Sequence, residues 1–244
     1  MELSFNLIFK YSDILNPISP HALFGGGTLA ELNPTKVILD LGSGKGNPAI
    51  LWASVFGVQV DGYDLMKSYV EYANARAKML NLSHRVKFFC KDVRELKVTR
   101  EYDVVASLGL GIAHTFGSID TALRNFGTMI RKGGFLFLAE PVWLTTAIPS
   151  KVLANLGAVE EHFLTTSELQ RVLKRHGFHV KGSFESTKTD WALYIQPVNH
   201  AMKEAIESAS ELAGEAQRVI DSFKAEYNAV NRYWDMVLWV AKAF

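Results

Sequence analysis

The sequence has 244 residues, of which 48% are hydrophobic and 21% charged, and its formal net charge is +1. This composition is typical of a folded globular protein and excludes a disordered chain, while the near-neutral charge gives no argument for a nucleic-acid or membrane-surface partner. The single cysteine, Cys90, excludes an intramolecular disulfide and fits a reducing, cytoplasmic location, and no apolar run approaches the roughly 18 residues that span a bilayer.

Apolar runs of strand length alternate with helical patterns through most of the chain. Gly25-Gly26-Gly27 first separates an N-terminal segment, residues 1–35, from the main body. The runs that predict strands are VILDL (37–41), VQVDGYD (58–64), VKFFC (86–90), YDVVASL (102–108) and FLFLAE (135–140), and helical patterns occupy residues 48–56, 70–81 and the stretch from Ser118 to Gly133-Gly134. This alternation predicts parallel strands joined by right-handed crossovers, hence a doubly wound sheet.

The C-terminal part departs from this alternation. Thr165 and Glu168 have capping-box spacing at the start of a short helix that ends at Gly177. Two further strands are predicted at the C-terminal end, and one long helical pattern, with Gly214 as a candidate kink, separates them. The chain is therefore divided into an N-terminal lid segment (1–35), a core (36–187) that includes the strand 178–187, a helical insertion (188–232) that includes the helix 198–228, and a final strand (233–244).

A glycine-rich loop joins the first predicted strand to the first helix. Gly42, Gly44 and Gly46 in VILDLGSGKGN permit a sharp turn and the close approach of a ligand, although a tight structural turn is the alternative for the loop alone. A dinucleotide-binding loop needs G-x-G-x-x-G/A, and Asn47 stands at its last position. Lys45 is out of frame for the phosphate-binding pattern G-x-x-x-x-G-K-[ST].

Two acids follow at the ends of the next two strands. Asp64 lies 22 residues after Gly42, where a carboxylate accepts hydrogen bonds from both hydroxyls of a ribose. Asp92 stands just past the third strand. A solvated helix cap is the alternative for either acid singly. Three successive strand ends that each offer a suitable group favour a ligand site.

These residues resemble the (D/E)-x-G-x-G-x-G loop and following acids of class I S-adenosylmethionine-dependent methyltransferases, over about residues 37–140, with Asp40 as the leading acid. The resemblance implies a Rossmann-like, doubly wound sheet of seven strands with the last strand antiparallel, an N-terminal lid and an inserted C-terminal helix. It implies S-adenosylmethionine as cofactor and S-adenosylhomocysteine as product. The sequence is most similar in style to the small-molecule methyltransferases of ubiquinone and menaquinone biosynthesis, so we expect a small-molecule acceptor, and a homodimer stays open.

The resemblance also assigns residues to the cofactor. Asp92 would receive the adenine amino group, the Val93 amide would face the ring, and Leu108 would flank the methyl group. The full set of expected cofactor contacts is Asp40, Gly42, Ser43, Gly44, Gly46, Asp64, Leu65, Asp92, Val93 and Leu108. No metal is expected, because the histidines are scattered without H-x-x-x-H spacing.

The acceptor side is marked less clearly. His114 follows the fourth strand and is a candidate general base, with a packed or hydrogen-bonding role as the alternative. Glu140 ends the fifth strand and either faces the cleft or bonds loop amides. Candidate acceptor contacts, with core packing as the alternative for the first three, are Trp143, Trp191, Tyr194 and, from the family's lid, Tyr11.

The absence of an Asn or Asp followed by Pro-Pro and an aromatic after the fourth strand counts against amines on nucleic acids. Two alternatives from other classes stay open. One is a NAD-linked oxidoreductase of similar fold, against which Asn47 counts. The other is a non-catalytic S-adenosylmethionine-binding module that interacts through the helix 198–228.

Overall fold

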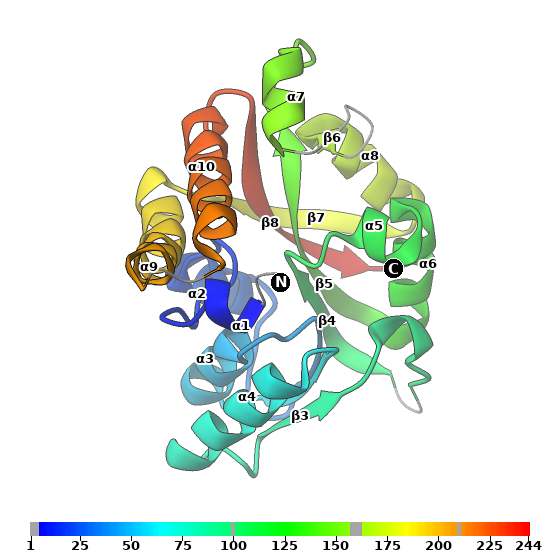
Figure 1. The fold of residues 1–244 in the computed structure, drawn as a ribbon. Coiled ribbons are helices and arrows are strands. Elements are labelled where there is room, and N and C mark those ends of the chain that lie inside the picture. The colour runs from blue at the N-terminus through cyan, green and yellow to red at the C-terminus, as the bar shows by residue number, and fades with distance from the viewer. Residues whose placement is uncertain (1–4, 99–100, 157–162, 209–210) are drawn as a thin grey trace.

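One twisted sheet organises the molecule. The computed structural model describes residues 5–98, 101–156, 163–208 and 211–244, which Figure 1 shows around this sheet. The strand order is β3-β2-β1-β4-β5-β8-β7, and a short strand, β6, pairs with β5 off this path. The strands are β1 Val37–Leu41, β2 Gln59–Asp64, β3 Val86–Cys90, β4 Tyr102–Leu108, β5 Ile130–Trp143, β6 Leu164–Thr165, β7 Phe178–Glu185 and β8 Trp234–Ala243. The first four agree with the predicted ranges to within a residue.

The strand directions confirm the predicted topology. Strands β1 to β5 pair in parallel, whereas β8 runs antiparallel to both β5 and β7. The main path therefore holds seven strands, with the C-terminal one reversed. Strand β6 is an eighth strand that was not predicted, because its two residues are too few to show a period.

Helices cover both faces of the sheet, and side chains that alternate along each strand serve the two layers in turn. Along β4, Val104 belongs to the buried cluster that contains Trp52 of one helical layer, and Val105 belongs to the cluster that contains Phe126 of the other. The helices of the first layer are α2 Pro20–Leu29, α3 Asn47–Phe56 and α4 Lys67–Met79, and those of the second are α5 Ile112–Phe116, α6 Ile119–Met129 and α8 Thr166–Arg175.

The glycine triplet lies inside helix α2, and its interpretation as a boundary was wrong. Ser19 caps this helix by accepting a hydrogen bond from the Ala22 amide, and Pro20 occupies its first turn. A Cβ at Gly25 would clash with the Phe184 ring of β7 and one at Gly27 with the Phe56 ring of α3. The glycines therefore serve close packing of α2 against the sheet and α3.

The prediction of a single helix over 198–228 was also wrong. Two helices that pack against each other occupy this region, α9 (Lys188–Glu207) and α10 (Ala213–Ala229). Residues 209–210, between them, lie outside the described residues. A continuous helix over both would extend about 60 Å. The pair instead buries apolar side chains of both helices around Phe9 of the N-terminal segment. The insertion lies beside α1 (Phe5–Ile8), and α10 contacts α7 (Ser150–Leu156) (Figure 1). Trp191 and Ile195 of α9 join the buried cluster of the first helical layer.

Strand β5 begins earlier than predicted, because α6 ends at Met129 rather than at the Gly133-Gly134 pair. Tyr102 already pairs with Ile130, and the register shifts before Val104 pairs with Phe135. The two glycines thus accommodate an irregularity inside a strand, where a Cβ at Gly134 would lie 2.7 Å from the Asp103 carbonyl oxygen. Among the described residues, no helix combines the length and apolar character that crossing a bilayer requires.

Candidate active site

The carboxyl ends of β1, β2 and β4 meet at one edge of the sheet, where the strand order reverses. The loop after β1 is hydrogen-bonded to the end of β2, and Leu110, which follows β4, lies against its Gly42. The amides of Gly42 and Ser43 donate to the Tyr63 carbonyl of β2 at 2.8 and 3.0 Å. In open parallel sheets, such a switch point is where ligands bind.

Glycine is required in this loop by backbone conformation. Gly42, Gly44 and Gly46 have φ values of +74°, +52° and +78°, in the left-handed region that L-residues with a Cβ adopt only at a cost. Their Cα positions are also approached closely by Leu110 at Gly42 and by Leu15 at Gly44. The glycines therefore allow the backbone to turn sharply, and they also allow Leu110 and Leu15 to pack closely against the loop.

Asp64, the last residue of β2, holds the glycine loop. Its Oδ2 accepts a hydrogen bond from the Gly44 amide at 2.8 Å, and its Oδ1 accepts one from the Met66 amide at 2.8 Å. An ionised carboxylate has about four acceptor sites. Two therefore remain for hydroxyl groups of a ligand.

Asp40 and Ser43 present polar atoms that have no partner among the described residues. Asp40 is 1% exposed, and neither its Oδ2 nor the Ser43 hydroxyl makes a hydrogen bond. Burial, with a smaller contribution from the charge of Asp64, raises the pKa of Asp40 to about 7. A buried acceptor of this kind at the wall of a cavity suits a positively charged donor such as an ammonium group.

These groups line a cavity of about 500 Å³. Its polar side is the glycine loop with Asp40 and Asp64, and its other side is largely apolar. The lining residues are Phe5, Phe9, Asp13, Ile14, Leu15, Asn16, Ile18, Leu23, Asp40, Gly42, Ser43, Gly44, Lys45, Asn47, Pro48, Asp64, Leu65, Met66, Tyr69, Leu108, Gly109, Leu110 and Tyr194. Of the expected cofactor contacts, the structure thus brings together Asp40, Gly42, Ser43, Gly44, Asp64, Leu65 and Leu108.

Three expected cofactor contacts do not line the cavity. Gly46 lies behind the loop, against Phe88. Asp92 is at the end of β3, where its carboxylate bonds the Arg94 side chain and caps a short 3-10 turn by accepting from the Arg94 amide at 2.8 Å. The Arg94 bonds hold the pKa of Asp92 down, at about 2. Val93 is buried in the core.

Neither candidate catalytic residue reaches the cavity. His114 is exposed on α5. Glu140 is buried in β5 and accepts a hydrogen bond from the Ile112 amide at 3.2 Å. It therefore takes the alternative role considered for it, that of binding the loop between β4 and α5, which includes the lining residues Gly109 and Leu110.

Burial raises the pKa of Glu140 to about 8, against the smaller opposing effect of its bonds to the Ile112 and Gly111 amides. Because the folded-state pKa lies above the usual 4.5, this group stabilises the fold fully below about pH 4.5 and loses that contribution as the pH rises through 8. We expect Glu140→Gln to gain stability relative to the wild type between pH 5 and 8.5, by an amount on the order of a few kcal/mol. Urea unfolding of both proteins at the two pH values measures this, and parallel pH profiles would contradict it.

Of the candidate acceptor contacts, only Tyr194 lines the cavity. Trp143 is buried in the core, and Trp191, also buried, donates its indole N–H to Asp235 at 2.9 Å. Tyr11 points instead to α9, where its hydroxyl donates to Glu204. The lid segment does form a wall, but through other residues.

Leu15 and Asn16 are wall residues that were not predicted from the sequence. Leu15 packs against Gly44 of the glycine loop, and the Asn16 side-chain amide donates to the Leu108 carbonyl at 2.9 Å. Asn16 also accepts a bond from the Ile18 amide, which fixes the turn at ILNPISP. Asn16, which precedes a proline, could have indicated a fixed turn in this segment, because asparagine and proline both favour turns.

Comparison with known proteins agrees with this geometry. A family model described as a methyltransferase domain matches residues 38–134. A methyltransferase from Geobacter sulfurreducens, solved in complex with S-adenosyl-L-homocysteine, is 25% identical with a TM-score of 0.89 and covers 98% of this chain and 97% of its own. YjhP of Escherichia coli is 27% identical over 183 residues, 74% of this chain and 73% of YjhP. The 27-O-demethylrifamycin SV methyltransferase of Amycolatopsis mediterranei is 32% identical over 125 residues, 51% of this chain and 44% of that enzyme.

The reversed final strand and the glycine-loop cavity at the switch point belong to a Rossmann-like fold that this chain shares with methyltransferases of known structure. The chain carries a methyltransferase domain by this match, and it is similar in sequence and fold to S-adenosylmethionine-dependent methyltransferases solved with S-adenosyl-L-homocysteine. These relatives give no support to the alternative of a NAD-linked oxidoreductase.

Proposed function

We propose that this methyltransferase transfers the methyl group of S-adenosylmethionine to a small, uncharged acceptor inside the cavity. The observation that carries this proposal is the division of the cavity into a polar side at the glycine loop and an apolar side built by the N-terminal segment, β4 and α9. A relative named for a small-molecule substrate, the 27-O-demethylrifamycin SV methyltransferase, supports an acceptor of this class.

The polar side fits the cofactor. Asp64 would accept bonds from the two ribose hydroxyls with the acceptor sites that Gly44 and Met66 leave free. The orphaned Oδ2 of Asp40 and the Ser43 hydroxyl would bind the amino-acid end, where an ammonium supplies the donors that both atoms lack. The sulfonium supplies an activated methyl group, which leaves alignment and exclusion of water to the protein.

The apolar side indicates the acceptor. Lys45 is the only cation among the described lining residues, and its ammonium is already bonded to two carbonyl oxygens. A phosphorylated or carboxylated acceptor would therefore find no free positive partner there. Burial raises the pKa of Tyr194, so its phenol stays protonated and would act as a hydrogen-bond donor to the acceptor.

No histidine occurs among the described residues that line the cavity. This composition favours an acceptor atom that is nucleophilic without a histidine base, because methyl transfer needs a base only when the acceptor must lose a proton. The exposed thiol of Cys90 supports the expected reducing, cytoplasmic location. A homodimer stays a prediction.

Transfer of label tests the acceptor class. The protein is incubated with methyl-labelled S-adenosylmethionine and a cell extract, which is then separated into small-molecule, protein and nucleic-acid fractions. We expect protein-dependent label in the apolar small-molecule fraction, and we expect Tyr194→Phe to lower its rate. Label that appears chiefly in protein or nucleic acid would overturn the acceptor assignment.

A further inference from the structure

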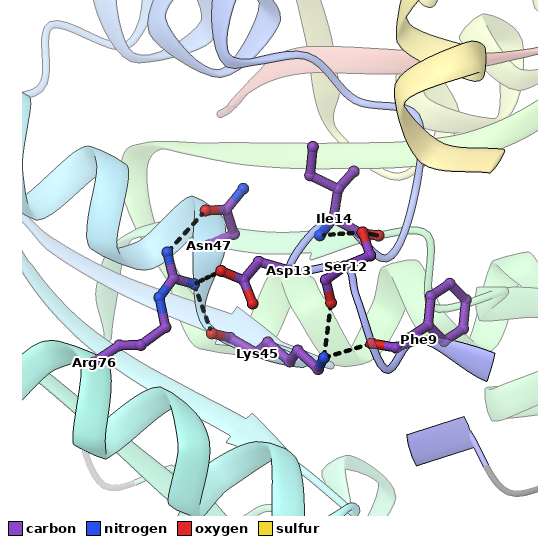
Figure 2. A network of polar contacts seen from close by, with 7 residues as sticks. All are labelled: Phe9, Ser12, Asp13, Ile14, Lys45, Asn47 and Arg76. Atoms are coloured by element: carbon purple, nitrogen blue, oxygen red, sulfur yellow. Dashed lines mark hydrogen bonds and ion pairs between the residues drawn. The ribbon is translucent and has the colours of Figure 1, made fainter. Parts of the chain in front are cut away.

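Lys45 lies in the middle of the glycine loop, yet its side chain points away from the polar side of the cavity. Figure 2 shows its ammonium directed at the backbone of the N-terminal segment. The Nζ donates to the Phe9 carbonyl and to the Ser12 carbonyl, each at 2.7 Å. The residue is only 9% exposed, and buried lysines of this kind are rare unless they are paired.

Burial lowers the pKa of Lys45, and the nearby charges of Asp13 and Arg76 act on its ammonium in opposite directions. Among the described residues, no carboxylate forms an ion pair with Lys45, and the rings of Tyr69 and Tyr72 lie 5.6 and 5.2 Å from its Nζ. Without the two carbonyls, the desolvated cation would lose its strongest partners. The N-terminal segment and the loop lysine therefore stabilise each other.

A second cation strengthens the same junction from helix α4. Arg76 donates to the Lys45 carbonyl at 3.3 Å and forms an ion pair with Asp13 of the N-terminal segment at 3.4 Å (Figure 2). It also reaches Asn47, directly after the loop, at 3.5 Å. The loop and the segment are thus joined at both ends of Lys45, through its backbone and through its side chain.

The held segment forms much of the apolar wall. Phe9, whose carbonyl bonds Lys45, packs its ring at 6.0 Å from that of Tyr194, and Leu15, three residues beyond Ser12, lies against Gly44. Both side chains line the cavity on the side that we assign to the acceptor. The position of this wall consequently depends on a residue of the cofactor loop.

We propose that Lys45 is a positioning residue, which fixes the N-terminal segment as the acceptor-side wall of the cavity and links that wall to the cofactor loop. In its acceptor part the inference rests on the proposed function. The link between loop and segment stands independently and is measured without any acceptor. Lys45 itself touches neither reacting group, since its ammonium is used by the two carbonyls.

Hydrogen exchange of the whole protein tests the link. Lys45→Met keeps an unbranched apolar side chain, one atom shorter than lysine, but removes all donors, so we expect the fold to be retained. We expect amides of residues 5–18 to exchange about ten- to a hundredfold faster, because two charge-assisted bonds are lost there. Lys45→Arg should keep most of the protection, and Arg76→Met should accelerate the same amides to a smaller degree. Lys67→Met is the matched control, because that lysine is exposed on α4.

The dissociation rate of S-adenosylhomocysteine provides a second readout. With the wall loosened, we expect this ligand to leave Lys45→Met about tenfold faster, and to leave Lys45→Arg at nearly the wild-type rate. Unchanged exchange in residues 5–18 of Lys45→Met would overturn the proposal, as would an equal acceleration in β1 and β4, which would show a general loss of stability. If wild-type protein binds no S-adenosylhomocysteine, the proposed function fails, while the exchange result still decides the link.

Discussion

Replacing Asp64 with alanine should weaken binding of S-adenosylhomocysteine by about ten- to a hundredfold. Two effects add in this variant. The ribose hydroxyls lose their carboxylate partner in a partly closed site, and the Gly44 amide loses the acceptor that holds the glycine loop at 2.8 Å. Isothermal titration calorimetry of the wild type and the variant measures the difference.

Asp64→Asn should lose less, because the side-chain amide keeps one oxygen acceptor. Asp221→Ala, which removes an exposed carboxylate from α10, is the control and should bind as the wild type does. Equal affinity of Asp64→Ala and the wild type would mean that the ribose is held elsewhere.

The second large effect is expected at Gly46, where alanine should lower the free energy of unfolding by about 2–5 kcal/mol. The left-handed backbone, with φ +78°, contributes about 1–2 kcal/mol. Overpacking contributes about 1–3 kcal/mol more, since a Cβ there would lie 2.5 Å from Phe88 of β3 and 3.0 Å from Ala73 of α4. Urea unfolding measures the change.

Gly117 is a matched control for the backbone contribution. Its φ of +79° is nearly the same, but a Cβ there would meet nothing within 4 Å. Gly117→Ala should therefore cost only the backbone part, about 1–2 kcal/mol. If the two variants lose equal stability, close packing around Gly46 is not what fixes the glycine there.

Local pattern was sufficient for the core of the fold. The run 37–41, its glycine turn and the helix that follows form a repeat unit whose burial and turn chemistry agree, so the boundaries of β1 and α3 were predicted to within a residue. The antiparallel direction of β8 came from the resemblance to a family. The hydrophobic pattern alone does not predict the direction of this strand, since the sequence of a strand buried on both faces is apolar throughout in either direction.

Tertiary packing decided the elements that were predicted incorrectly. Glycines favour turns in isolation, yet Gly25 and Gly27 are helical because Phe184 and Phe56 leave no room for a Cβ beside α2. In the insertion, Pro197 inside α9 obscured a helix that begins at Lys188. Both outcomes depend on contacts with distant parts of the chain, which periodicity does not record.

The site was predictable where it follows strand ends and was not where it follows contacts between segments. Asp40 and Asp64 were found because the ends of parallel strands share one edge of the sheet. The bonds from Lys45 to Phe9 and Ser12 join residues more than thirty positions apart, and no motif marks them. Trp143 and Trp191 were predicted to contact the acceptor but lie in the core. The sequence does not distinguish an aromatic residue that faces a cavity from one that faces the core.

We infer that the cavity at the glycine loop binds S-adenosylmethionine. Calorimetric titration of the folded wild-type protein with S-adenosylhomocysteine, and separately with NAD, tests it most directly. We predict one binding site for S-adenosylhomocysteine with a Kd on the order of micromolar, and no heat of binding with NAD. Absence of heat with S-adenosylhomocysteine on protein verified as folded, or saturable heat with NAD, would show that the cavity is not an S-adenosylmethionine site.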